Sequence, residues 1–210
     1  MLTQLAQGML TSVEIFLLTL LFSLPLGMVV MLLRRSRFRL VRWIIKIYIA
    51  VMRGTPLMLQ LLVWYFGPFY LFGMSIGNWR FPALILGFVL NYAAYFAEIY
   101  RGGIEAIDKG QYEAAQVLGY SKFRTFFRII LPQVLKIITP SVTNETITLV
   151  KDTSLAFVLA QAEMFTIAKQ IAAKEASVGP LMVAGAFYFV FNFVVAFVMD
   201  RIEKRLDYWS

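Results

Sequence analysis

The chain has 210 residues, of which 60% are hydrophobic and only 15% are charged, and its mean hydropathy is +0.73. This composition is typical of a multispan membrane protein and excludes an ordinary soluble domain, and the length predicts a single domain over residues 1–210. No Cys is present, which excludes disulfides and thiolate metal sites, and no His, which removes the commonest metal ligand and general base. The net charge of +8 is explained by basic residues held in cytoplasmic loops, so we expect neither a nucleic-acid partner nor a bound metal.

Apolar stretches long enough to approach the roughly 20 residues that cross a bilayer recur along the chain. Between the first and second of them, Trp43–Met52 has the pattern of an amphipathic, interfacial segment. A short outer loop, Gly73–Arg80, follows the second stretch, and a charged tail, Asp200–Ser210, ends the chain. The sequence therefore predicts an all-α polytopic protein with five transmembrane helices, at Met9–Leu33, Leu57–Phe72, Phe81–Tyr100, Val134–Ala160 and Leu181–Met199.

The distribution of Lys and Arg predicts the orientation of these spans. With five spans, most basic residues fall on one side and only Arg80, Lys169 and Lys174 fall in loops on the other. Without the polar fourth span, the basic tail would move to the other side, against the positive-inside tendency. We therefore expect the N-terminus outside and the C-terminus inside the cell.

One long polar and basic run, residues 101–136, interrupts the apolar pattern between the third and fourth spans. Lys109–Leu118 is predicted to be a short helix that ends at Gly119, since glycine commonly supplies the left-handed residue there. Ser121 is predicted to cap a second helix that ends at Pro132. The apolar side chains of this second helix, Phe123, Phe126, Phe127 and Ile130, are predicted to face the membrane domain.

Ionisable residues inside the predicted fourth span point to function. A charge at mid-bilayer costs about 2.5–3.5 kcal/mol, so these side chains must face protein or water. Two interpretations stay open: the polar face lines a translocation path, or Lys151 pairs with a carboxylate such as Glu98 and holds helices together. The face, gathered by spacings of three and four residues and extended by one turn, comprises Asn144, Glu145, Thr148, Lys151, Asp152, Thr153 and Ser154.

The third span carries two further polar residues, Asn91 and Glu98, which lie seven residues apart and so roughly on one helix face. We count both among the candidate translocation residues. Glu98 lies near the predicted cytoplasmic end, where a solvated helix end or a pair with Arg101 is an equally good explanation. Arg53, with the Gly-Thr-Pro that follows it, is read first as the start of a helix and second as a gate contact.

The 101–136 run resembles the cytoplasmic loop of ABC importer permeases. Glu113-Ala114-Ala115, then Gly119, and then Ile129, Leu131 and Pro132 match every spaced position of the EAA motif of that family. Other segments resemble its polar amino-acid branch, and together they cover most of residues 50–160. These segments are Arg53-Gly54-Thr55-Pro56-Leu57, Ala97–Ile104, Gly110-Gln111 and Lys151-Asp152-Thr153-Ser154-Leu155.

The resemblance implies the fold of a type I ABC importer permease, a multi-pass location in a bacterial inner membrane, and a defined set of partners. These would be two ATPase subunits, a second permease subunit as homodimer or heterodimer, and an extracytoplasmic amino-acid-binding protein. It implies that residues 101–136 form the coupling loop to the ATPase, through Glu113, Ala114, Ala115, Gly119 and Pro132, and that the substrate is a polar amino acid.

The chain lacks the Gly-rich phosphate-binding loop that ends in Gly-Lys-Ser or Gly-Lys-Thr. We therefore expect no enzymatic activity and no cofactor on this chain, with ATP and Mg bound by the separate ATPase subunit. The alternative is an ion-coupled secondary amino-acid carrier, which the buried carboxylates would suit.

Overall fold

The structure, a computed structural model, describes residues 1–75 and 77–206, and within these ranges every regular element is a helix. The all-α prediction is confirmed. Ile76 of the predicted outer loop and residues 207–210 of the charged tail lie outside the described residues. The elements are α1 (Leu2–Arg34), α2 (Arg39–Gly54), α3 (Leu57–Phe72), η1 (Gly77–Trp79), α4 (Arg80–Glu105), α5 (Lys109–Val117), α6 (Lys122–Thr125), η2 (Phe126–Ile130), α7 (Leu131–Asp152), η3 (Thr153–Leu159), α8 (Met164–Glu175) and α9 (Gly179–Leu206).

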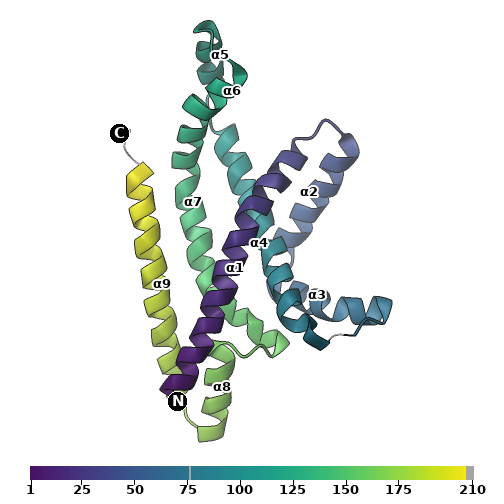
Figure 1. Ribbon diagram of the computed structural model, residues 1–210, viewed down its shortest axis with the longest axis vertical. Coiled ribbons are helices and arrows are strands. Elements are labelled where there is room, and N and C mark those ends of the chain that lie inside the picture. Colours follow the sequence, from purple (N-terminus) through teal and green to yellow (C-terminus); the bar gives the residue numbers. More distant parts are fainter. Residues whose placement is uncertain (76, 207–210) are drawn as a thin grey trace.

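The long helices α1, α4, α7 and α9 run along the longest dimension of the molecule (Figure 1). Helices α5 and α6 project from one end, and the N-terminus and α8 lie at the other. The described end of α9 lies toward the α5 end, so the two ends of the chain lie on opposite sides, as an odd number of crossings requires. Which side faces the cytoplasm stays a prediction.

Four helical stretches are long and apolar enough to cross a membrane, and the pair α2 and α3 makes a fifth if it is counted as one span. Helix α3 has the predicted bounds of the second span, but it is bent by 114° from α2 and passes as a span only together with it. The predicted interfacial segment Trp43–Met52 lies inside α2, whose one fully buried side chain is Ile49. The four straight stretches are Leu2–Arg34, Gly77–Glu105, Lys122–Leu159 and Gly179–Leu206.

The bend between α2 and α3 has a specific polar support. Pro56 has no N–H to continue the helix, so carbonyl groups at the end of α2 need other donors. Asn91 Nδ2 donates to the Met52 carbonyl at 2.9 Å and to Gln60 Oε1 at 3.0 Å, and Gln60 Nε2 donates to the Met52 and Thr55 carbonyls at 3.0 and 3.1 Å. The two buried amides therefore stabilise the bend.

Close approach of α1 to its neighbours depends on two glycines. A Cβ atom on Gly27 would lie 2.8 Å from Cβ of Phe96, and one on Gly8 would lie 2.9 Å from backbone atoms of Met164. Both distances are shorter than van der Waals contact, so only glycine fits without a shift. Small residues at such crossings let membrane helices pack backbone to backbone. Helix α1 is therefore held directly against α4 along its length and against the start of α8 near the N-terminus.

Helix α8 was not among the elements predicted from the sequence, and its first turn is stabilised by a buried carboxylate. Glu163, which is 0% exposed, accepts hydrogen bonds from the backbone N–H groups of Phe165 and Thr166, both at 2.7 Å. The same carboxylate accepts from the hydroxyls of Tyr188 on α9 at 3.0 Å and of Ser12 on α1 at 3.4 Å. One side chain therefore caps α8 and joins it to α1 and α9.

We expect replacement of Glu163 by alanine to lower the melting temperature of the detergent-purified protein by about 5–15 °C. Buried donors left without an acceptor cost about 1–3 kcal/mol each, and 1 kcal/mol corresponds to about 2–4 °C in a chain of this size. Thermal unfolding followed by size-exclusion chromatography measures the change. Glu175→Ala, at the exposed end of the same helix, is the matched control and should melt like the wild type. A Glu163→Ala variant that melts within 1 °C of the wild type would contradict this role.

The same carboxyl makes a predictable contribution to the pH dependence of stability. Burial raises the pKa of Glu163, while the hydrogen bonds from Phe165 and Thr166 oppose that rise. A pKa raised on folding means that the folded state binds the proton more tightly than the unfolded state. The contribution is therefore full below the unfolded-state pKa and is lost as the pH rises through the folded-state pKa.

Candidate functional site

Helix α5 ends as predicted at a left-handed glycine. Gly119 has φ +75°, its N–H donates to the Gln116 carbonyl at 3.0 Å, and the N–H of Tyr120 donates to the Ala115 carbonyl at 3.0 Å. These two bonds are those of the Schellman motif, which satisfies the last carbonyls of a helix. At the other end, the Asp108 side chain accepts from the N–H of Gly110 at 2.6 Å. Both ends of α5 are therefore determined by residues close to them in the sequence.

The second short helix begins as predicted, with the Ser121 hydroxyl accepting from the N–H of Arg124 at 3.3 Å. The prediction that its phenylalanines face the membrane domain is wrong for two of them. Phe123 is 73% and Phe127 50% exposed, with their rings 4.4 Å apart, whereas Ile130 is 0% exposed. Figure 1 shows the physical reason. Helices α5 and α6, which together we call the tip, extend beyond the ends of the other helices, so these two phenylalanines have no other helix of the chain to pack against.

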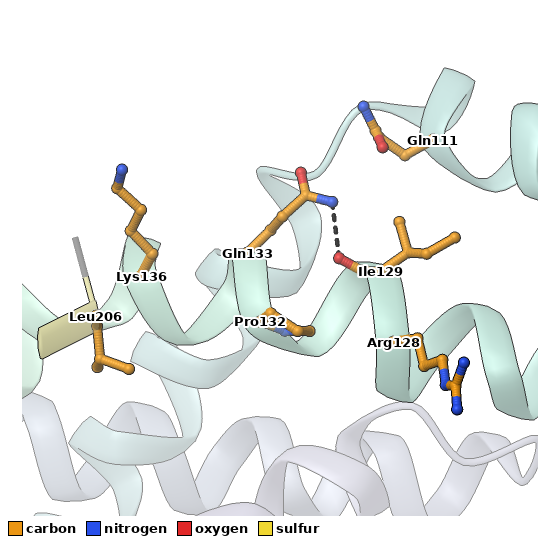
Figure 2. Close-up of a pocket in the computed structure, with 7 residues that line it drawn as sticks. All are labelled: Gln111, Arg128, Ile129, Pro132, Gln133, Lys136 and Leu206. Carbon is orange, nitrogen blue, oxygen red and sulfur yellow. Dashed lines mark hydrogen bonds between the residues drawn. The ribbon is translucent and has the colours of Figure 1, made fainter. Parts of the chain in front are cut away.

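The prediction that Pro132 ends the second helix is also wrong. The helical path continues from Lys122 to Leu159, because a π-helical turn over Phe126–Ile130 precedes α7 and places Pro132 in the first turn of α7. A proline in a first turn needs no N–H partner. Figure 2 shows how the wider turn is stabilised: the Gln133 side chain reaches back and donates to the Ile129 carbonyl at 2.7 Å. Helix α6 and the fourth span therefore form one continuous helical rod, Lys122–Leu159.

Near this rod, a cavity of about 380 Å³ separates α5 from the start of α7. Figure 2 shows Gln111 of α5 on one side and Arg128, Gln133 and Lys136 along the rod on the other, with Leu206 of α9 nearby. Of the predicted coupling residues, Pro132 lines this cavity, and the others lie on α5 or directly after it. Glu113 and Ala114 are exposed on α5, Ala115 is 1% exposed, and within the described part of the chain Glu113 forms no hydrogen bond or ion pair. The exposed carboxylate is therefore accessible to a partner.

The polar face of α7 divides between two sides of the helix. Glu145 lines a cavity of about 410 Å³ with residues of α4. Asp152 also faces α4, where it accepts a hydrogen bond from the hydroxyl of Tyr92 at 2.7 Å. Asn144 is exposed and Thr148 is half-buried on the same helix. The structure therefore directs Glu145 and Asp152 toward the same neighbouring helix.

Lys151 lies on the other side. It lines a separate cavity of about 330 Å³ with Phe165, Gly185 and Tyr188, so it faces α8 and α9. It does not pair with Glu98, which overturns that pairing as an explanation of the polar face. The hydroxyls of Ser154 and Thr153 donate back to the carbonyls of Lys151 and Val150, at 2.7 and 2.8 Å. These two hydroxyl protons are therefore used within the helix.

Glu98 is the centre of an ion-pair cluster that the sequence suggested only in part. It pairs with Arg34 at the end of α1, with Arg101 one turn further along α4 at 2.9 Å, and more loosely with Arg53 at 3.7 Å. Arg101 also pairs with Glu105. The predicted Glu98–Arg101 pair is confirmed, and the arginine of α1 was missed because the spacing within one helix carries no information about contacts to another.

Asn91 and Glu98 are not brought into one site. Asn91 is 5% exposed and supports the bend after α2, as described above, whereas Glu98 joins the arginine cluster. Tyr92, which is 2% exposed and bonded to Asp152, was not singled out from the sequence. A lone tyrosine in an apolar span gives no signal that its hydroxyl meets a carboxylate 60 residues further on.

The whole-chain comparison decides the family. Residues 13–208 match the family described as "Binding-protein-dependent transport system inner membrane component". The chain belongs to this family. The EAA resemblance is thereby confirmed, and membership supports a multi-pass location in the membrane.

Relatives and solved structures agree with this family. The L-cystine transport system permease protein TcyB of Bacillus subtilis is 35% identical over 97% of this chain and 86% of its own length. The arginine transport system permease protein ArtQ of the same organism is 38% identical over 95% and 91%. A crystal structure of an amino acid ABC transporter with histidines has a TM-score of 0.87 and 31% identity, covering 97% of this chain and 94% of that one.

The MetNI methionine ABC transporter, in an inward-facing crystal form, has a TM-score of 0.68 with 17% identity over 98% of this chain and 95% of that one. At this identity the similarity concerns the fold alone. Together the two structures confirm the type I importer permease fold predicted from the motif. The ion-coupled carrier, the alternative from the sequence, is not favoured.

Proposed function

We propose that this chain is the membrane-spanning permease subunit of an ATP-driven importer for polar amino acids. The observation that carries the proposal is the exposed tip of α5 and α6, which bears the EAA residues and large apolar side chains at the end of a membrane domain. Val117 is 87% and Leu118 72% exposed beside Phe123. Apolar groups gathered on a projecting tip indicate a protein partner. The family assignment makes that partner an ABC ATPase.

Energy enters through that partner. The small, exposed Ala114 permits close approach, and the exposed Glu113 carboxylate suits a charge-assisted hydrogen bond to a basic group of the ATPase. ATP and Mg belong to the two ATPase subunits, and this chain itself catalyses no reaction. Closure of the ATPase pair moves the tip, and the rod that ends in α7 carries this motion to the polar face.

The substrate path involves a second permease subunit. Asn144 and Lys151 are exposed in the single chain although they lie deep in a membrane-spanning stretch. Because a lipid-facing charge is costly, these side chains face either a partner subunit or a water-filled path. A second permease subunit packed around this face, in a homodimer or a heterodimer, would provide both the partner surface and a path between the subunits. Substrate arrives from an extracytoplasmic binding protein, with the N-terminus outside and the tip in the cytoplasm.

An amino acid is the substrate class that the relatives support, since their names specify L-cystine and arginine transport. The carboxylates of Glu145 and Asp152 suit the ammonium group that every amino acid carries. The proposed translocation residues are those of the polar face together with Glu98. Asn91 is proposed to act indirectly, through the bend that it stabilises.

Purification of the tagged chain from its native host in a mild detergent tests the proposal. We expect an ATPase subunit to copurify in a 1:1 ratio with the permease, and reconstituted vesicles to take up an amino acid only when ATP and a binding protein are supplied. Uptake that follows a proton or sodium gradient without ATP would contradict it. Recovery of the chain alone under several detergents would also count against it.

A further inference from the structure

The cavity between α4 and α7 contains two side chains of opposite charge that have no strong partner. Its volume of about 410 Å³ lies in the range of small-ligand sites. Arg53, at the end of α2, and Glu145, on α7, both line it. They come from different helices and form no ion pair with each other in the described structure. The cavity therefore places an acid and a base around open space.

Arg53 is held in place but keeps its hydrogen-bond donors unused. Its guanidinium lies over the ring of Tyr95, 5.3 Å from the ring centre. Its shortest ion-pair distance, to Glu98, is 3.7 Å, which is too long for a hydrogen bond. Within residues 1–75 and 77–206 it forms no hydrogen bond, although a guanidinium offers five N–H groups. Stacking therefore orients the group while its donors stay free.

The charge of Arg53 is not needed by Glu98. That carboxylate already pairs with Arg34 and Arg101, so Arg53 is the third and most distant cation around it. Glu145, in turn, has no hydrogen bond or ion pair in the described part of the chain. Of the charged residues that line this cavity, Arg53 and Glu145 are thus the two that form no hydrogen bond within the described residues, whereas Glu98 and Arg101 are bonded to each other.

We infer that Arg53 binds the α-carboxylate of the amino-acid substrate, whose α-ammonium is bound by Glu145. The inference rests on the proposed function and does not give this role to Lys151, which lines a different cavity. A guanidinium recognises a carboxylate with two parallel hydrogen bonds, which an ammonium cannot do. Recognition of both backbone charges serves any α-amino acid and leaves the side chain to other contacts.

The test compares an amino acid with its α-carboxamide, which lacks the carboxylate charge. The purified permease and ATPase complex, without binding protein, is titrated with radiolabelled L-arginine and L-glutamine in competition with the amide of each. We expect the wild type to prefer the acid by about 10- to 100-fold, as charge-assisted hydrogen bonds imply. In Arg53→Ala the preference should fall below about threefold while affinity for the amide changes little, and Arg53→Lys should retain part of the preference.

Two further variants separate this role from charge in general. Arg101→Ala is the matched control, because it removes another cation from the same cavity, and it should keep the preference for the acid. Lys151→Ala removes a cation of the polar face and tests whether Lys151, in place of Arg53, binds the carboxylate; we expect the preference to persist. Arg53 is 44% exposed, so its loss should leave the fold intact, and Arg53→Lys keeps the packing if Arg53→Ala aggregates. An unchanged preference in Arg53→Ala beside ATP-driven uptake by the wild type overturns the inference alone. Loss of preference in Lys151→Ala instead assigns the carboxylate to Lys151 and overturns it too. Absence of ATP-driven uptake by the wild type contradicts the proposed function itself.

Discussion

Replacement of Gly119 by valine is expected to reduce ATP-driven uptake by at least about tenfold while leaving the protein in the membrane at normal amounts. Gly119 has φ +75°, a conformation that costs other L-residues roughly 1–2 kcal/mol and β-branched residues most. A Cβ atom there would meet nothing within 4 Å, so the cost is conformational and not steric. The strain is relieved by moving the corner between α5 and α6, which displaces the apolar tip from the position in which it would meet the proposed ATPase partner.

Two measurements separate this effect from misfolding. Uptake and copurification of the ATPase should both fall in Gly119→Val, whereas the melting temperature of the permease should stay near that of the wild type, because the tip carries little of the buried core. Gly119→Asn is the matched control, since asparagine tolerates the left-handed region, and it should retain most of the uptake. Gly67→Val, at a helical position with equally open surroundings, should transport normally. Normal uptake by Gly119→Val would show that the conformation of the tip does not matter for coupling, and would contradict the prediction.

The second large effect is expected at the two carboxylates of α7 that face α4. Glu145→Gln and Asp152→Asn should each lower uptake, and the double variant should lower it by about 100-fold or more. Each carboxylate offers a charge-assisted hydrogen bond to an ammonium, worth roughly 1.5–3 kcal/mol, and the amides keep the shape while removing the charge. Asp152 also loses part of its bond with Tyr92, whose hydroxyl needs an acceptor.

The measurement is initial uptake over a range of substrate concentrations, with expression checked for each variant. Loss of substrate interaction should raise the KM or abolish uptake while basal ATP hydrolysis persists. Glu105→Gln, which neutralises an exposed carboxylate on α4 outside this face, is the control and should change uptake less than twofold. If Glu145→Gln and Asp152→Asn both transport normally, the substrate passes elsewhere.

Local sequence predicted the end of α5 at Gly119 and the start of α6 at Ser121, because each depends on local chemistry. These two residues satisfy backbone groups within a few residues of themselves, so their roles follow from residue type and spacing. The same holds for the first, third and fifth spans, whose apolar length is a local property, whereas the polar fourth span was predicted from the distribution of Lys and Arg along the whole chain. The motif that resembles the family is likewise a local pattern of spaced residues.

Contacts between distant helices could not be predicted in this way. Periodicity grouped Lys151 with Glu145 and Asp152, yet α7 is packed on both sides, and about a third of a turn is enough to direct Lys151 toward α9 and the carboxylates toward α4. The role of Glu163 depends on Ser12 and Tyr188, which are far away in sequence. The bend after α2 depends on Asn91 in the same way. Each of these required the tertiary arrangement.

The continuous rod from Lys122 to Leu159 has a mechanical consequence. Between Phe126 and Glu145 the axis advances roughly 28 Å at 1.5 Å per residue, with one π-helical turn near the tip and no loop in between. Such a rod acts as a lever, so a small tilt imposed at the tip is delivered as a sideways displacement at the carboxylates. The π-helical turn also determines the direction in which the later side chains point, because one extra residue rotates every residue beyond it by about 100° around the helix axis. Deleting a single residue from that turn would leave both ends intact and aim Glu145 away from α4.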